Sequence, residues 1–519
     1  MSTHGTAGYD PAAGEPAVES STNTAEHAIA AIARARVVQP GWAALPVSER
    51  ARRLRRIRDY LTAEADRLAA VISEDNGKTR IDALATEILP AAMAVDYYCR
   101  KARRFLRDRR PLPASLLLAN KNAKLVRVPF GVVGIISPWN YPFAIPFSEV
   151  IMALLAGNAV VLKVSGATRM VGRALERCIA SAGLPGGLFS HLDLPGPVAG
   201  QALLQGGVDK LFFTGSTAVG KSLMVRAAET LTPLVLELGG KDPLLVCPDA
   251  DLPRAAAGAV WAGMQNCGQS CAGVERIYVH EAVYEPFLEE LARRVRALRI
   301  GADRDFGVDL GAMTTAEQKA EVTRQVAEAL AAGATLHAQS AIAEGERFLP
   351  AMVLTGVDHR MEIMRRETFG PVVGVMAVTD MDQAVALAND SEYGLTASVW
   401  TRDARAGEAL ARRIKAGTVM INDHLMSHGL PEAPWGGFKQ SGFGRTHGAA
   451  GMDEMTQVQC LVHDRLPGVR RNLWWHPHGP EIYAGLRGIL DLLYHPRRRN
   501  RLAGLLRLLR IYPRTFRAG

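Results

Sequence analysis

Between residues 131 and 420, short runs of apolar residues alternate with stretches that have the character of helices. The runs occupy residues 131–137, 159–162, 210–213, 233–236 and 243–246. Runs that are apolar throughout fit strands buried on both faces, and alternation of strand and helix is typical of parallel sheets covered by helices. The sequence therefore predicts an α/β fold with mostly parallel sheets.

The segments before residue 131 have a different pattern of apolar and polar residues. Residues 24–110 predict helices, because apolar side chains recur at spacings of three, four and seven; they are Leu54, Ile57, Leu61, Leu68 and Val71. The alternating run 124–128 predicts a strand. Residues 1–24 are rich in small and polar side chains and lack the basic start and apolar stretch of a secretory signal, so we expect a disordered leader.

The net charge of +9 is concentrated at the C-terminus. From Arg465 to Arg517 there are twelve arginines and two acids, which gives 12 − 2 = +10 and leaves 9 − 10 = −1 for the remainder. Arginines also surround one apolar helical face, formed by Leu502, Leu505, Leu506 and Leu509. The sequence predicts a basic amphipathic helix that lies on an anionic membrane surface, or else packs on the protein or across a subunit interface.

Several other functions are disfavoured. The tail lacks the interleaved aromatic residues of a nucleic-acid site, and no run of about 18 apolar residues could span a membrane. The pairs Cys267/Cys271 and His476/His478 each lack a second pair of ligand residues that could complete a metal site, so no metal is predicted. The six cysteines show no paired spacing, which fits a reducing compartment and a cytoplasmic protein.

Cys271 is the candidate nucleophile. A lone buried cysteine is more often an apolar core residue. For Cys271, however, the sequence also offers a candidate general base and a candidate oxyanion donor. Glu237 directly follows an apolar run, at the strand end where ligands gather in α/β folds, and is a candidate general base. Asn140 also follows an apolar run, between Pro138 and Pro142, and its amide could donate to an oxyanion. This pattern predicts covalent catalysis by a cysteine.

A second candidate site lies in the segment Thr214 to Lys221. It follows an apolar strand and opens a helix, so free N–H groups could meet a phosphate, and Gly215 and Gly220 leave room for close approach. By itself the segment could equally be an ordinary strand-to-helix turn.

An ordered series of motifs then resembles the aldehyde dehydrogenase superfamily from about residue 35 to residue 463. The motifs are Pro138-Trp139-Asn140, Phe213-Thr214-Gly215-Ser216, Glu237-Leu238-Gly239-Gly240-Lys241, Gly268-Gln269-Ser270-Cys271, Glu367-Thr368-Phe369-Gly370-Pro371 and Gly436-Gly437-Phe438-Lys439-Gln440-Ser441-Gly442. The resemblance implies an enzyme that oxidises aldehydes with NAD or NADP. The alternative is a catalytically silent member that serves as a structural or binding protein. Residues 267–276 are also similar to membrane-associated plant and fungal members.

The resemblance implies a role for each catalytic candidate. Cys271 would attack the aldehyde, and Asn140 with the Cys271 backbone N–H would hold the oxyanion. Glu237 would activate the water that hydrolyses the thioester. Because the branch that transfers its acyl group to coenzyme A generally lacks this glutamate, we expect a carboxylic acid as the product.

The resemblance also implies a cofactor site. Its members would be Trp139, Lys163, Ser165, Gly215, Ser216, Gly220, Glu367 and Phe369, with Lys163 on the adenosine ribose and Glu367 on the nicotinamide ribose. Gly166 stands where NAD-preferring members carry a glutamate that repels a 2′-phosphate. We therefore expect NADP to be tolerated, with Lys163 or Arg169 as the phosphate partner.

By analogy with the family, several apolar side chains should line the substrate tunnel; the candidates are Tyr141, Phe143, Ile145, Phe147 and Trp435. Ser148 stands near the position where succinate-semialdehyde enzymes carry an arginine. A hydrophobic, aliphatic or aromatic, aldehyde is therefore the expected substrate.

The family architecture implies three parts. A Rossmann-like nucleotide-binding domain would comprise residues 25–110 and 130–239, and an α/β catalytic domain residues 240–445. A small β oligomerisation extension would comprise residues 111–129 and 446–463, followed by the basic tail, 464–519. Because unpaired strand edges invite pairing between subunits, we expect a homodimer or homotetramer.

Overall fold

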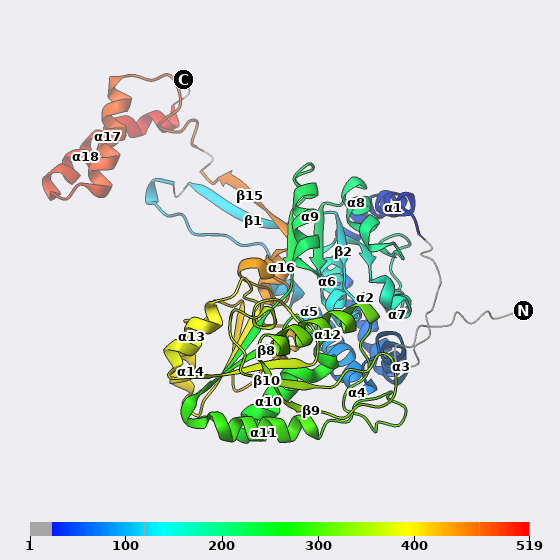
Figure 1. Cartoon of the computed structure of the whole chain (residues 1–519). Helices are drawn as coiled ribbons and strands as arrows, with labels where there is room; N and C mark the ends of the chain where they lie inside the picture. Colours follow the sequence, from blue (N-terminus) through cyan, green and yellow to red (C-terminus); the bar gives the residue numbers. More distant parts are fainter. Residues whose placement is uncertain (1–22, 119, 467, 518–519) are drawn as a thin grey trace, which may run out of the picture. The chain divides into compact units, whose positions relative to one another are not determined.

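The computed structural model describes residues 23–118, 120–466 and 468–517 (Figure 1). The predicted leader lies outside the described residues except for Asn23 and Thr24, and Thr24 is the N-cap of the first helix. The chain forms two compact units. The large unit contains the residues up to Leu106 and Val128–Gln457, and the small unit contains Arg107–Arg127 and the residues from Val458 onward.

The helices predicted at the start of the chain are present. They are α1 (Ala25–Ala43), α2 (Val47–Ala63), α3 (Ala65–Asn76), α4 (Arg80–Ala83) and α5 (Leu89–Phe105). One turn of π-helix, Leu84–Ile88, joins α4 to α5. Four residues of the predicted apolar stripe of α2 and α3, Leu54, Ile57, Leu61 and Leu68, are inaccessible to solvent, and the fifth, Val71, is partly buried.

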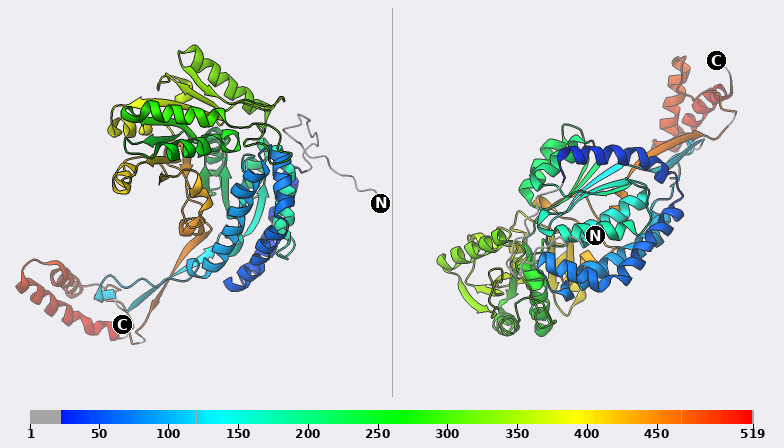
Figure 2. Two further views of the ribbon diagram at one scale, coloured as in Figure 1. Left: turned by 90° about the horizontal axis from the view of Figure 1, so that it is seen from below. Right: turned by 90° about the vertical axis from the view of Figure 1, so that its right-hand side faces the viewer.

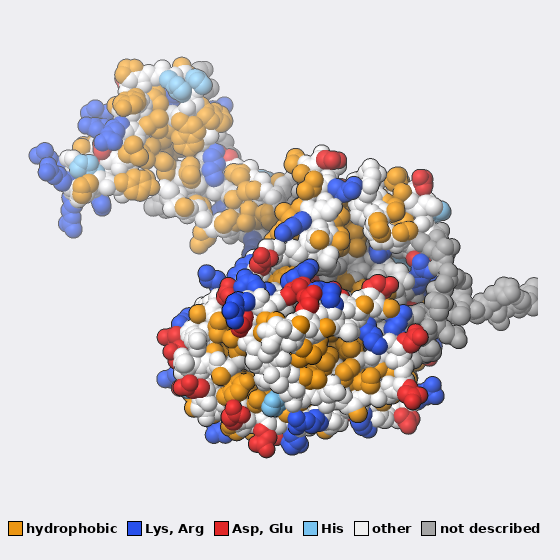
Figure 3. All heavy atoms as spheres, viewed as in Figure 1, with side chains coloured by type: hydrophobic (Ala, Val, Ile, Leu, Met, Phe, Trp, Pro, Cys, Tyr) orange, Lys and Arg blue, Asp and Glu red, His pale blue; other side chains and the backbone are white. Residues whose placement is uncertain are grey.

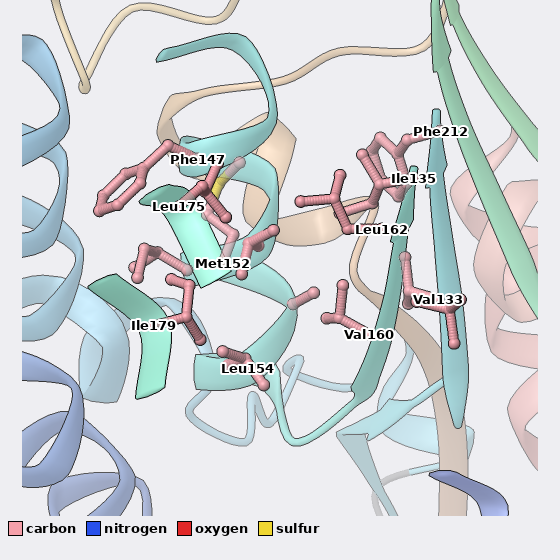
Figure 4. Packing of buried hydrophobic residues seen from close by; sticks show 14 of the residues in the cluster. Val133, Ile135, Phe147, Met152, Leu154, Val160, Leu162, Leu175, Ile179 and Phe212 are labelled. Carbon is pink, nitrogen blue, oxygen red and sulfur yellow. The ribbon is translucent and has the colours of Figure 1, made fainter. Parts of the chain in front are cut away.

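The first sheet has six strands in the order β14-β6-β5-β2-β3-β4. The strands are β2 (Val132–Ile136), β3 (Ala159–Lys163), β4 (Phe189–His191), β5 (Lys210–Thr214), β6 (Leu234–Glu237) and β14 (Gly442–Phe443). All neighbours are parallel except β14 and β6. Helix α1 and α8 (Gly196–Gln205) cover one face, and α6 (Ala144–Ala156) covers the other (Figure 2). Leucine, valine and methionine side chains fill the space between α6 and the strands (Figure 4).

The second sheet has seven strands in the order β13-β12-β7-β8-β11-β10-β9. They are β7 (Asp242–Val246), β8 (Val274–His280), β9 (Thr335–Gln339), β10 (Met352–Thr355), β11 (Val372–Val378), β12 (Thr396–Trp400) and β13 (Thr418–Ile421). Only the β9–β10 pair is antiparallel. Around it lie α10 (Leu252–Met264), α11 (Tyr284–Arg296), α12 (Ala316–Ala331), α13 (Met381–Asn389) and α14 (Ala404–Ala411). The predicted α/β fold with mostly parallel sheets is confirmed.

The predicted β extension is a two-stranded sheet of β1 (Lys121–Pro129) and β15 (Thr456–Asp464). Its second segment is shorter than expected. Helix α16 (Gly448–Asp453) packs on α5 and α6, and Met452 and Met455 are buried in the core, so residues 446–457 belong to the large unit.

The small unit ends in a pair of helices, α17 (Pro480–Tyr494) and α18 (Arg498–Ile511), followed by a 3-10 turn, Tyr512–Phe516. The predicted amphipathic helix corresponds to α18, but it packs against α17 rather than standing alone. Within the described residues, no helix has the length and hydropathy needed to cross a bilayer.

Candidate active site

Cys271 lies in the loop between α10 and β8, and buried hydrogen bonds hold this loop in a strained conformation. Asn266 and Cys267 both have φ near +54°, a region that side chains other than glycine rarely adopt. The Asn266 amide donates to the carbonyl of Asn140 over 2.9 Å, and the Cys267 thiol donates to the carbonyl of Gly311 over 3.0 Å. Cys267 therefore has a structural contact, whereas Cys271 is only partly buried and faces a cavity.

Glu237 ends β6 and reaches the same cavity as Cys271. Both of its carboxylate oxygens are buried, and neither has a hydrogen-bond partner among the described residues. Burial raises the pKa of Glu237 to about 7, although Cys271 and Trp435 partly offset the effect. Burial also raises the pKa of the Cys271 thiol well above its ordinary value, and the nearby Glu237 carboxylate raises it further. This pair can hold or release a proton near neutral pH.

Asn140 is held through its backbone, which leaves its side chain available for a ligand. The Lys78 ammonium donates to the Asn140 carbonyl over 2.8 Å and is paired with Glu87 over 2.7 Å, and both charged side chains are fully buried. Glu87 in turn accepts from the N–H of Phe143 over 2.7 Å. This ion pair joins Lys78, in the connection between α3 and α4, to Glu87 of the π-helix, and it clamps the loop before α6.

This clamp could not be predicted from the sequence. Lys78 and Glu87 lie nine positions apart on segments whose helical pattern says nothing of a contact, and a π-helix cannot be recognised from periodicity. Only the buried position of two opposite charges identifies it.

Two cavities meet at the cysteine. The first, here called the apolar cavity, has a volume of about 300 Å³, and the second, the polar cavity, about 660 Å³. Three residues line both cavities: Thr214, Glu237 and Cys271. Asn140 lines the polar cavity beside them. The three predicted catalytic side chains therefore lie together at the junction of the two cavities. A ligand in the apolar cavity and a ligand in the polar cavity could come into contact there.

The apolar cavity has mostly hydrophobic walls. Of the predicted lining residues, Tyr141, Ile145 and Trp435 belong to it. The prediction was wrong for Phe143 and Phe147, which are fully buried and stack with ring centroids 5.4 Å apart. Figure 4 shows Phe147 on the side of α6 that faces away from the strands. The remaining large apolar walls were not predicted; they are Leu89, Pro90, Met93, Trp261, Leu425, Met426 and Leu430.

The charged residues on the walls of the apolar cavity are both acids. Besides Glu237 there is Glu149 on α6, whose pKa is raised to about 8 by burial and by the charge of Glu237. Ser148 precedes it, is buried, and is not part of the wall. The described lining contains no lysine or arginine. A ligand with a carboxylate would therefore meet a carboxyl group that is mostly protonated at neutral pH, and no cation to balance its charge.

The polar cavity contains most of the predicted cofactor residues. Trp139, Gly215, Ser216, Glu367 and Phe369 line it. Helix α9 (Thr217–Ala227) begins there, and Ser216 is its N-cap. An N-terminal helix turn with uncommitted N–H groups suits a pyrophosphate, so these residues fit a dinucleotide.

The wall of this cavity around Phe369 is shaped by a second buried ion pair. Glu275 accepts from the N–H of Phe369 over 2.8 Å and is paired with Lys241, which also donates to Thr368. The pair holds Phe369 at a φ of 54°, with its ring edge-on to Trp139 at a centroid distance of 5.4 Å. Glu275 was not predicted, although it follows Cys271 by only four residues.

Three predicted cofactor residues do not line the polar cavity. Lys163 is buried at the end of β3, where burial lowers its pKa, and Ser165 accepts from the Ala167 N–H as a helix cap. Gly220 packs against Leu238, since an added Cβ would lie 2.7 Å from that side chain. Arg169, the other proposed phosphate partner, is paired with Asp193 over 3.2 Å.

Comparison with known proteins agrees with this geometry. The model of the aldehyde dehydrogenase family matches residues 2–461, and the chain therefore belongs to that family. It is an enzyme of the class that oxidises aldehydes with NAD or NADP.

Similar curated proteins have different names. A Mycolicibacterium smegmatis protein, provisionally named succinate-semialdehyde dehydrogenase [NADP(+)], is 41% identical over 89% of this chain and 90% of its own. The 4,4′-diapolycopene aldehyde oxidase of a Methylomonas species is 40% identical over 87% of this chain and 84% of its own.

Solved structures also match. An NAD+ complex of the Bacillus cereus aldehyde dehydrogenase has a TM-score of 0.82 at 31% identity, covering 88% of this chain and 92% of that one. Lactaldehyde dehydrogenase of Escherichia coli has a TM-score of 0.83 at 32% identity, covering 88% and 95%.

Proposed function

We propose that this enzyme oxidises an apolar aldehyde to the carboxylic acid, with Cys271 as nucleophile and Glu237 as general base. The observation that carries the proposal is the junction of two cavities at these side chains. One cavity is walled by hydrocarbon and suits the aldehyde, and the other fits a dinucleotide. The reacting carbon would lie between them.

In the first step the Cys271 sulfur forms a bond to the aldehyde carbon, and the thiol proton passes to the Glu237 carboxylate, which releases it to solvent before the second step. The carbonyl oxygen becomes an oxyanion, for which Asn140 and the Cys271 N–H are the donors. Within the described part of the chain, that N–H donates to no other group. When bound, the nicotinamide supplies an acceptor for the hydride of the former aldehyde, and Cys271 then carries a thioester.

In the second step Glu237 accepts a proton from water as the water attacks the thioester. The carbon–sulfur bond breaks, the carboxylic acid leaves, and the proton that Glu237 took from water passes to the sulfur and restores the thiol. A pKa of about 7 leaves a large fraction of Glu237 ionised at neutral pH and able to act as a base. Its unpartnered oxygens are consistent with a carboxylate that binds water.

The apolar cavity favours a hydrophobic substrate over succinate semialdehyde, whose carboxylate would face Glu149 without a cation. One relative acts, by its name, on 4,4′-diapolycopene aldehyde. We therefore infer that the substrate of this enzyme is an aliphatic or aromatic aldehyde.

For the cofactor we propose that both NAD and NADP are accepted. Gly166 is exposed and carries no side chain that could repel a 2′-phosphate. Because Arg169 is already paired with Asp193, Lys163 is the better candidate for the phosphate partner.

The alternative remains a silent member of the family that binds without turnover. The buried, unpartnered Glu237 argues against it, because a buried carboxylate without a partner lowers the stability of the fold and is retained where function requires it.

We also propose that the protein is a cytoplasmic homodimer or homotetramer, with the β1–β15 edge as the candidate contact between subunits. In addition, we propose that it associates with anionic membranes through its C-terminal segment.

The deciding experiment measures kcat/KM by reduction of NAD and NADP with saturated aldehydes of increasing length. Each buried methylene contributes about 0.8 kcal/mol, so kcat/KM should rise about fourfold per carbon until the cavity is full. Succinate semialdehyde should be poorer than butanal, which has the same chain length. Faster oxidation of succinate semialdehyde would contradict the proposed substrate class, and no oxidation of any aldehyde would favour the silent alternative.

A further inference from the structure

Helices α17 and α18 lie side by side and form, with the turn Tyr512–Phe516, what we call the C-terminal hairpin (Figure 1). Glycines let the two backbones approach closely. A Cβ added to Gly504 would lie 2.4 Å from the Gly488 carbonyl, and one added to Gly485 would lie 2.3 Å from Ile511. Ile489 and Ile511 are buried in a small core beside this close contact, whereas several other large apolar side chains of the two helices remain exposed.

The outer surface of the hairpin is unusually apolar. Leu502, Leu506 and Leu509 are 60%, 56% and 53% exposed, and Tyr483 and Tyr494 on α17 are 76% and 72% exposed. Leu505, which the sequence placed with the other leucines, is partly buried instead. Further exposed side chains extend this surface: Trp474, Trp475, Leu490, Tyr512 and Phe516. A concentration of exposed large apolar side chains of this kind marks an interaction surface.

The same hairpin is strongly cationic. Of the acids among residues 465–517, Asp491 is already paired with Arg487 and Arg507, at 3.3 and 3.1 Å. Arg498 and Arg499 at the start of α18 are exposed. Figure 3 shows hydrophobic side chains over much of the visible face of the hairpin and arginines gathered towards one end. The partner must accept both hydrocarbon and positive charge.

An anionic lipid bilayer meets both requirements. We infer that the C-terminal hairpin binds a bilayer, with its leucines and aromatic side chains in the interfacial layer and its arginines on lipid phosphates. A second copy of the hairpin would cover the apolar surface but would bring a further 8 − 2 = +6 of charge, from eight arginines and two acids in residues 480–516, against the first. A nucleic acid would neutralise the charge and leave the leucines exposed.

This inference deepens the membrane association proposed above by naming the unit that inserts and the lipid that it selects. It involves no residue of the active site. Both proposals fit an enzyme whose apolar aldehyde dissolves in membranes, but each can fail without the other.

The test is co-sedimentation of the full chain with vesicles of phosphatidylcholine, with and without one quarter phosphatidylglycerol. The hairpin variant carries Leu502→Asp, Leu506→Asp and Leu509→Asp. These side chains are exposed and contribute little to packing, so oxidation of a water-soluble aldehyde should be unchanged. The matched control carries Val37→Asp and Val225→Asp, which are 82% and 74% exposed on the large unit.

We expect the wild type and the control to bind the anionic vesicles, and the hairpin variant to bind them more than about tenfold more weakly. A second variant, Arg498→Gln with Arg499→Gln, should lose the preference for phosphatidylglycerol, whereas Arg103→Gln with Arg104→Gln on α5 should retain it. Equal binding by the hairpin variant would overturn the inference while leaving membrane association in place. If no vesicles bind, and the hairpin variant instead changes the oligomeric state in light scattering, the partner is a second copy.

Discussion

The Glu237 carboxyl group and the Cys271 thiol lie close enough in one cavity for each to shift the pKa of the other. Glu237 raises the pKa of the thiol, and the thiol lowers that of Glu237, which burial holds near 7. The base is therefore poised for proton transfer, whereas the thiol is held neutral. A cationic nicotinamide in the polar cavity would favour the thiolate, which couples nucleophile activation to cofactor binding.

Replacement of Glu237 by glutamine should slow thioester hydrolysis by about 10²- to 10⁴-fold, because the general base is lost. Hydride transfer should still occur once per site, so stopped-flow absorbance should show a burst without turnover. In the wild type the hydrolysis rate should rise with pH through about 7, where Glu237 ionises. A variant with the same pH dependence as the wild type would show that another group is the base.

The same substitution should affect stability in a pH-dependent way. Because the pKa of Glu237 is higher in the folded chain than its ordinary value, its contribution to stability is present at low pH and is lost as pH rises through about 7. Glu237→Gln should therefore stabilise the protein above this pH by on the order of 1–3 kcal/mol, and by less under acidic conditions. Chemical unfolding at about pH 5.5 and pH 8.5 measures the difference, and a gain independent of pH would contradict this account.

Asn140→Ala should lower the rate of hydride transfer by about 10²- to 10³-fold, since one oxyanion donor is lost. The loop should keep its position, because Lys78 and Asn266 bind the Asn140 backbone carbonyl and not its side chain. Cofactor affinity, measured by fluorescence quenching, should change little. A large loss of affinity would mean that Asn140 acts on the cofactor.

Lys78→Met should destabilise the protein by about 3–5 kcal/mol, because it leaves Glu87 buried without its counter-charge. The double variant Lys78→Met with Glu87→Leu removes both charges and should recover most of this loss. Its activity should remain low, since the Asn140 loop has lost its clamp. Recovery of both stability and activity would show that the ion pair has no positioning role.

Gly166→Glu should reduce kcat/KM for NADP by more than about tenfold and leave that for NAD nearly unchanged, because an acid repels the 2′-phosphate. The position is exposed, and the nearest atom to an added Cβ is 3.8 Å away, so the backbone can accept the change. Gly186→Glu, at another glycine with open space, is the matched control. An equal effect on both cofactors would place the adenosine 2′ position elsewhere.

The strands and the residues at their ends could be predicted, because fully buried parallel strands leave continuous apolar runs and polar side chains directly after them mark the ligand edge. The residues that form the walls of the apolar cavity could not be predicted from the sequence. Leu89 and Met93 lie on an amphipathic helix, and periodicity does not distinguish a side chain in a cavity from one in solvent. Phe143 and Phe147 were misplaced because α6 begins there and turns positions four apart towards the core.

The central claim is that Cys271 carries the acyl group. The direct measurement is mass spectrometry of the Glu237→Gln variant after reaction with decanal and NAD or NADP, followed by proteolysis. We predict the mass of a decanoyl group on Cys271, its loss in the double variant with Cys271→Ser, and its retention with Cys267→Ser. An acyl group on another residue, or an unmodified Cys271 after the burst, would contradict the account.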